Sequence, residues 1–136
     1  MAIFDAFLKI EGIQGEIKGE IQLESFSWGV SNSVSSSTGG AGAGKAVFSD
    51  FSFTSRLGKQ SAELFTAAAQ GTNLRTADLT IQDGRRMAKV SFFDVFISSY
   101  KQDMTHQPTV LGDTTPLEMV SLNFAKVNIE IGSPIK

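Results

Sequence analysis

Residues 74–99 read Leu-Arg-Thr-Ala-Asp-Leu-Thr-Ile-Gln-Asp-Gly-Arg-Arg-Met-Ala-Lys-Val-Ser-Phe-Phe-Asp-Val-Phe-Ile-Ser-Ser, and this stretch indicates a sheet protein. Its first part, 74–82, alternates apolar and polar residues, as a strand buried on one face does. The residues expected to face inward are Ala77, Leu79 and Ile81. The dipeptide Asp83-Gly84 predicts a two-residue hairpin turn. A second strand is therefore expected over 85–99, antiparallel to the first.

This second strand carries apolar side chains on both faces, most plainly at Phe92 and Phe93. Antiparallel sheets commonly expose one face to water, so a strand that is apolar on both sides needs cover on both sides. Two interpretations stay open: the strand lies deep in the core, or its outer face meets another subunit. The single tryptophan, Trp28, has the same two interpretations.

Four further segments show the period of two that strands have: Ile3–Glu11, Glu20–Asn32, Ala46–Arg56 and Glu118–Gly132. In the second of these the apolar parity changes near Ser25, and in the last it slips at Ala125-Lys126. The first change indicates a bulge or a strand that shifts between faces, and the second indicates a bulge. Together with the hairpin, the count is six or seven strands.

One helix is expected over Lys59–Gln70, with Ser61 as its N-cap and Gly71 as the residue that ends it. A single short helix beside so many strands predicts a mostly β fold, in which two packed sheets or a small barrel have the helix on one side. The 136 residues are near the usual size of one domain, so the whole chain, 1–136, is predicted to be a single domain.

Two segments lack core residues. Residues 31–45 consist almost entirely of Ser, Asn, Thr, Gly and Ala, and residues 101–116 are polar and rich in turn formers. For 31–45, a flexible surface loop and a loop that becomes ordered on assembly both remain open. A phosphate-binding loop is excluded, because the GxxxxGK[ST] pattern is missing and a strand follows rather than a helix.

Composition and motifs exclude several classes of function. The charge is nearly balanced, with 12 basic and 14 acidic residues, so no basic face for nucleic acid or an anionic membrane is expected. The chain has no cysteine and one histidine, His106, which argues against a structural zinc site. No cofactor motif and no set of nucleophile, base and orienting residue is recognisable, so we expect no enzyme.

The N-terminal residues form neither a basic region nor an apolar core of the kind a signal peptide has. No apolar run approaches the roughly 20 residues that span a bilayer. We therefore expect a protein made in the cytoplasm. The chain also holds eleven phenylalanines but one tyrosine. An extra buried interface or a core rich in phenylalanine would each explain so many fully apolar rings.

Several motifs occur in the order of a known family. The clearest is Glu24-Ser-Phe-Ser-Trp-Gly-Val-Ser-Asn32, and the others are Phe7 to Glu16, Phe51-Ser-Phe-Thr54, Glu63-Leu-Phe65 and Val120-Ser-Leu-Asn-Phe-Ala-Lys126. Together they resemble the haemolysin-coregulated proteins (Hcp), the tube subunits of type VI secretion systems. The turn Ile17-Lys-Gly-Glu20 departs from the family, because it lacks the Asp and His that many members carry there.

The resemblance implies a flattened β-barrel of two sheets with one helix at the side. It also implies that six copies close into a ring and that rings stack into a hollow tube. A contractile sheath propels this tube from the cell with a spike protein at its tip, and small effector proteins are held in the lumen. The alternative is a tail-tube protein of a phage-like contractile particle, which has the same architecture.

A closed ring needs two different contact surfaces on each copy. The candidates for the ring interface are Trp28, Phe92 and Phe96. In the family, the segment 31–45 corresponds to a loop that reaches the adjacent ring. The candidates for this stacking contact are Val34, Ser37, Gly40, Gly42 and Lys45.

Overall fold

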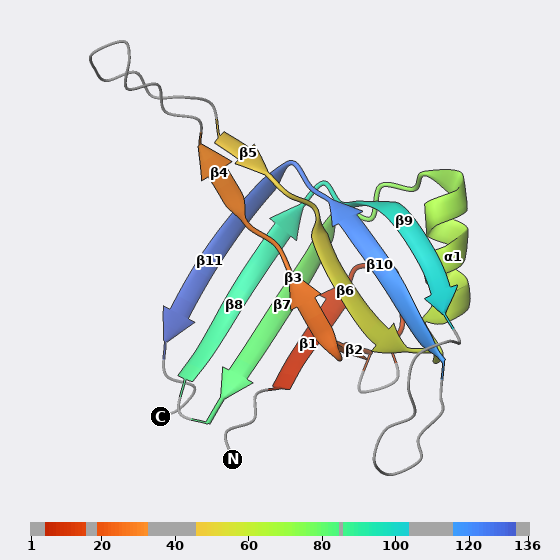
Figure 1. The fold of residues 1–136 in the computed structure, drawn as a ribbon, viewed down its shortest axis with the longest axis horizontal. Coiled ribbons are helices and arrows are strands. Elements are labelled where there is room, and N and C mark those ends of the chain that lie inside the picture. The colour runs from red at the N-terminus through yellow and green to blue at the C-terminus, as the bar shows by residue number, and fades with distance from the viewer. Residues whose placement is uncertain (1–4, 16–18, 33–45, 85, 104–115, 133–136) are drawn as a thin grey trace.

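The hairpin predicted from residues 74–99 is the centre of the larger sheet (Figure 1). Strands β7 (Thr76–Asp83) and β8 (Arg86–Phe93) pair antiparallel, and the pairing of Asp83 with Arg86 puts the turn one residue later than Asp83-Gly84 predicts. Gly84 takes the positive φ of 60° that such a turn requires. The computed structural model describes residues 5–15, 19–32, 46–84, 86–103 and 116–132.

Two packed antiparallel sheets confirm the predicted fold class. The larger has the order β11-β8-β7-β1-β2, and its remaining strands are β1 (Asp5–Ile10), β2 (Ile21–Gln22) and β11 (Lys126–Gly132). The smaller has the order β3-β6-β10-β9. Its strands are β3 (Ser25–Ser27), β6 (Phe51–Arg56), β10 (Leu117–Asn123) and β9 (Phe96–Asp103).

A two-stranded arm projects from one end of these sheets (Figure 1). It consists of β4 (Val30–Asn32) and β5 (Ala46–Phe48), which pair antiparallel with Val30 opposite Phe48. The segment that joins them lies outside the described residues. The arm was not predicted, because its two strands read as parts of the longer segments 20–32 and 46–56.

The long predicted strands are each divided, because the chain crosses from one sheet to the other. The parity change near Ser25 is the crossing from β2 to β3, and the slip at Ala125-Lys126 is the crossing from β10 to β11. Neither is a bulge within one strand. The predicted strand 85–99 is divided at Asp94, whose φ of 57° turns the chain out of the larger sheet. The predicted loop 101–116 is also corrected at its start, because β9 continues to Asp103.

Backbone hydrogen bonds hold these crossings in place. At the first, the Leu23 amide donates to the Ala6 carbonyl of the larger sheet at 2.9 Å. The next amide, that of Glu24, donates to the Thr54 carbonyl of the smaller sheet at 2.8 Å. Two consecutive amides thus bond to different sheets, and the backbone stays hydrogen-bonded through the crossing.

Aromatic side chains fill the space between the sheets. Phe51 and Phe53 come from the smaller sheet and Phe92 from the larger, and all three are buried. The ring centroids of Phe51 and Phe92 are 5.0 Å apart, and those of Phe92 and Phe124 are 4.7 Å apart. Ring contacts of this kind add to the free energy gained by burial alone. The abundance of phenylalanine is therefore explained in part by the core.

The helix α1 (Ser61–Gln70) lies beside β9 at the end of the molecule opposite to β11 (Figure 1). It buries Leu64 and Ala67 and ends at Gly71, whose φ of 65° confirms the predicted left-handed residue. The predicted N-cap is wrong. Gln60 holds that position without a side-chain capping bond, and the Ser61 hydroxyl donates instead to Glu118 at 2.7 Å.

A buried carboxylate, Glu118 of β10, ties the start of this helix to the smaller sheet. Its oxygen Oε2 accepts hydrogen bonds from the Ser55 hydroxyl and the Gln60 amide, both at 2.6 Å. Its oxygen Oε1 accepts from the Ser61 and Tyr100 hydroxyls, both at 2.7 Å. A buried carboxylate is tolerated only when such donors replace its water, so this cluster fixes the position of the helix.

The Tyr100 hydroxyl is the titratable donor of this cluster. Burial raises the pKa of Tyr100 above its ordinary value, and the hydrogen bond to Glu118 and its charge act in the same direction. A hydrogen bond with Gln102 opposes this rise, as does one with Ser61. Because the raised pKa belongs to the folded state, the contribution of Tyr100 to stability is complete below its unfolded pKa of about 10. It is lost as the pH rises through the folded pKa.

Tyr100 is the only tyrosine, so its ionisation can be followed alone by ultraviolet absorbance. We expect a midpoint above about 10 in the folded protein. In Glu118→Gln the midpoint should fall, because the charge that opposes ionisation is gone. Glu130→Gln, a carboxylate on the distant β11, should leave it unchanged. A wild-type midpoint at or below 10 would contradict the buried hydrogen bond.

Candidate assembly surfaces

The described residues contain no group of three or more His, Cys, Asp or Glu side chains that could hold a metal ion. The described helix is neither long nor apolar enough to cross a membrane. The cluster around Glu118 combines hydroxyls with a carboxylate, but Glu118 and Ser55 are buried and offer no surface to a substrate. Among the described residues, the exposed apolar side chains are the candidates for contacts with another molecule.

Large apolar side chains are exposed at four places in the described part of the chain, namely the arm, the strand β11, the helix α1 and the start of β9. The exposed residues are Val30, Val47, Phe48, Phe65, Phe96, Ile129 and Ile131. Apolar side chains grouped on an outer surface usually mark contacts with other molecules. The arm and β11 each expose more than one such residue, whereas α1 and β9 each expose one.

Polar contacts fix the base of the arm, first between its own two segments and then to the body of the protomer. The Ser49 hydroxyl accepts from the Gly29 amide at 2.8 Å and donates to the Gly29 carbonyl at 3.2 Å. Next to it, the Asp50 carboxylate accepts from the Ser98 hydroxyl at 2.6 Å and from the Asn123 amide at 3.3 Å. The ring of Phe48 also contacts that of Phe124, with centroids 5.9 Å apart. The protomer itself therefore sets the direction of the arm.

Of the three predicted ring-interface residues, Phe92 has to be corrected. Its side chain is 0% exposed and packs against Phe51, Trp28 and Phe124, so it has no surface left for a neighbouring copy. The interpretation as a deeply buried strand was the right one for this residue. Phe93, the next residue, points to the other face of the sheet, where the Lys126 ammonium lies 5.4 Å from its ring centroid.

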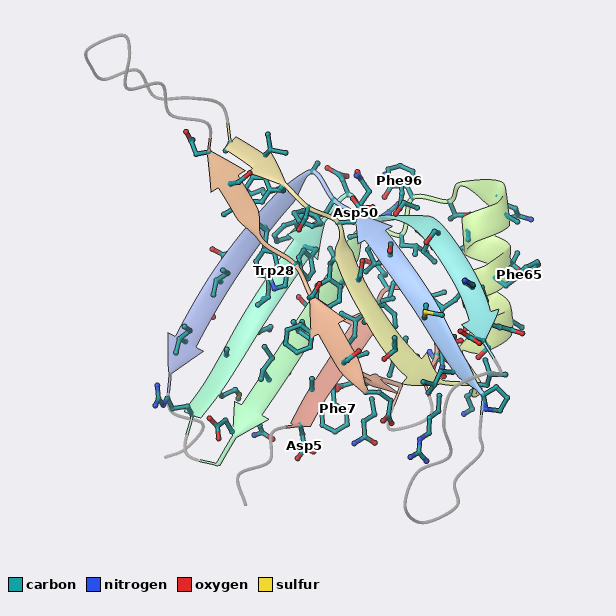
Figure 2. The ribbon with its side chains drawn as sticks, in the orientation of Figure 1. Asp5, Phe7, Trp28, Asp50, Phe65 and Phe96 are labelled. Carbon is teal, nitrogen blue, oxygen red and sulfur yellow. The ribbon has the colours of Figure 1, made fainter. Side chains whose placement is uncertain are left out.

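The other two candidates keep some accessible surface. Trp28 is half-buried and lies in front of the larger sheet near the base of the arm, with its ring 5.4 Å from that of Phe92 (Figure 2). Phe96 is exposed at the start of β9. Figure 2 shows these two residues apart from each other, and Phe65 on the outer side of α1. The structure therefore does not bring the predicted residues together into one patch.

The stacking candidates fall on residues 33–45, which lie outside the described part of the chain. They are Val34, Ser37, Gly40, Gly42 and Lys45. The same holds for His106, which lies within 104–115.

The sequence prediction missed most of the exposed apolar residues. Ile129 and Ile131 read as one apolar face of a strand, and Phe65 as part of the apolar stripe of the helix. A period of two or 3.6 shows that side chains share a face, but not whether anything covers that face. For Val30, Val47 and Phe48 there was a weak indication of exposure in the sequence, because they lie close to the Gly/Ser-rich segment.

Comparison with known proteins identifies the family. The family model described as "Type VI secretion system effector, Hcp" matches residues 7–131. Hcp1 from Salmonella typhimurium has a similar structure, with a TM-score of 0.76 at 27% identity over 96% of this chain and 87% of that chain. A structure described as a type six secretion system protein gives a TM-score of 0.80 at 26% identity, over 93% of this chain and 83% of that one.

A type VI secretion system effector from Yersinia pestis shares the fold, with a TM-score of 0.68 at 23% identity over 95% of this chain and 99% of that chain. The search of curated proteins found no match to this sequence.

Phe92 and Phe93 offer a matched test of which aromatic side chain belongs to the core. We expect Phe92→Ala to lower the free energy of unfolding by roughly 3–5 kcal/mol, as for other buried phenylalanines. Phe93→Ala should cost clearly less, because its ring is only half-buried on the outer face. Denaturant unfolding at low protein concentration measures both. Equal losses would contradict the assignment of Phe92 to the core.

Proposed function

Because this chain belongs to the Hcp family of type VI secretion proteins, we propose that it is the structural subunit of a type VI secretion inner tube. The observation that carries this proposal is the family match over residues 7–131. The likeness to Hcp1 from Salmonella typhimurium over nearly the whole chain supports it. We further propose that residues 1–136 act as a single domain in this role and that the role is structural rather than enzymatic.

In the proposed assembly six copies form a ring through head-to-tail contacts. Such a ring needs two different surfaces on each copy, and these must lie on different sides of the protomer so that the contact repeats. The exposed residues meet this requirement, since β11 with Ile131 and α1 with Phe65 lie at opposite ends of the molecule (Figure 1). Trp28 and Phe96 remain candidates for the same contacts.

Stacking of the rings is proposed to use the arm. It projects beyond both sheets (Figure 1) and presents Val30, Val47 and Phe48 to its surroundings. Apolar side chains on a projecting two-stranded ribbon are costly in water and favour a partner surface. The residues between β4 and β5 in the sequence, with Val34, Ser37, Gly40, Gly42 and Lys45, are proposed to take part in this contact with the adjacent ring.

The remaining parts of the proposal follow from the family alone. The tube would lie inside a contractile sheath, carry a spike protein at its tip and hold small effector proteins in its lumen. The protein would be made in the cytoplasm and leave the cell through the type VI apparatus, without a cofactor, nucleic acid or membrane as partner.

The assembled mass of the wild-type protein tests the proposal. Size exclusion with light scattering at micromolar concentration should give about six times the chain mass of 14.6 kDa. The physical reason is that exposed apolar surface at both ends is removed from water only in a closed assembly. A stable monomer at that concentration would contradict the tube.

A further inference from the structure

Every second side chain of β11 lies on the same face of the larger sheet as the core, but most of these side chains are exposed to solvent. In its pairing with β8, Val127 lies opposite Phe92 and Ile129 lies opposite Val90. Phe92 and Val90 are buried core residues, and cross-strand partners share a face. Val127, Ile129 and Ile131 therefore point to the same side as the core.

The side chains on this face become more exposed to solvent from Val127 to Ile131. Val127 still packs partly against the core, whereas Ile129 is 52% exposed and Ile131 is 72% exposed. Figure 1 shows the reason, since the smaller sheet ends at β3 and nothing of it lies over β11. Two isoleucines that would be core residues under one more strand are thus in contact with solvent.

The edge of β11 is open as well. The strand is seven residues long and ends the larger sheet, and in the described part of the chain only β8 pairs with it. The other edges are shorter or flanked, since β2 has two residues, β3 has three, and β9 has the helix α1 beside it. Proteins commonly guard a long edge with charges that point inward or with proline. On β11 the charged residues Lys126 and Glu130 point to the opposite face, where they lie across from Phe93 and Lys89.

We propose that Ile129 and Ile131 are covered by a second copy of this chain, which presents the outer side of its α1 end with Phe65. This inference rests on the proposed ring and specifies one of its contacts. A second copy fits because the same chain exposes 59% of Phe65 at the end opposite to β11. The Phe65 ring is held edge-on against Tyr100, with centroids 5.9 Å apart, so it is positioned before any partner arrives.

Four variants test the contact through the mass that each has in solution. Ile131→Glu and Phe65→Glu should each reduce the mass from about six chains to one, because each buries an unpaired charge in the contact. Asn128→Glu places the same charge on the same strand but on its other face, and it should leave six chains. The combination Ile131→Glu with Phe65→Lys should restore part of the assembly, since the two charges would then meet each other.

The outcomes separate this inference from the proposed function. A mass of six chains for Ile131→Glu or for Phe65→Glu overturns this contact while the ring stands. A single-chain mass for the wild type overturns the ring itself. Both substituted positions are largely exposed in the protomer, so circular dichroism of the single variants should match the wild type and show that they still fold.

Discussion

The two sheets of this protein differ in width, because a sheet of four strands covers a sheet of five. The core between them is complete where they overlap, and it is built around Phe51, Phe53 and Phe92. At β11 the overlap ends, and the apolar face of the larger sheet continues into solvent. A chain with this shape can remove that face from water only by contact with another molecule. The proposed ring of six copies would provide such a contact.

Polar groups set the other features of the protomer on which assembly depends. The buried carboxylate of Glu118 gathers donors from β6, β9 and the residues that begin α1, and so it fixes where the helix lies against the sheet. The hydrogen bonds of Ser49 and Asp50 fix the position of the arm in a similar way. In both places, hydrogen bonds that the fold must satisfy also determine how an exposed apolar surface is presented to a neighbour.

The sequence predicted the fold class, the central hairpin and the helix end at Gly71, because local rules govern each of them. It located both crossings but interpreted the one at Ala125 as a bulge, and it left the one near Ser25 open between a bulge and a strand that shifts between faces. A crossing and a bulge both change which side chains face inward, and only tertiary structure separates them. Phe92 was wrongly predicted to lie at the ring interface, and the exposure of Ile131 was not predicted, for a related reason. Whether an apolar face is buried depends on which strand ends the sheet and on what lies over it, and periodicity carries neither fact.

The exposure of Ile131 in the assembled protein tests most directly whether other copies of this chain cover the apolar face of β11. The chain has no cysteine, so Ile131→Cys and Asn128→Cys each introduce a single thiol, on opposite faces of β11. We expect a maleimide reagent at micromolar protein to modify Asn128→Cys readily and Ile131→Cys many times more slowly. On dilution to single chains the two rates should become similar. Equal rates in the assembled protein would contradict the account, because the apolar face of β11 would then remain in water.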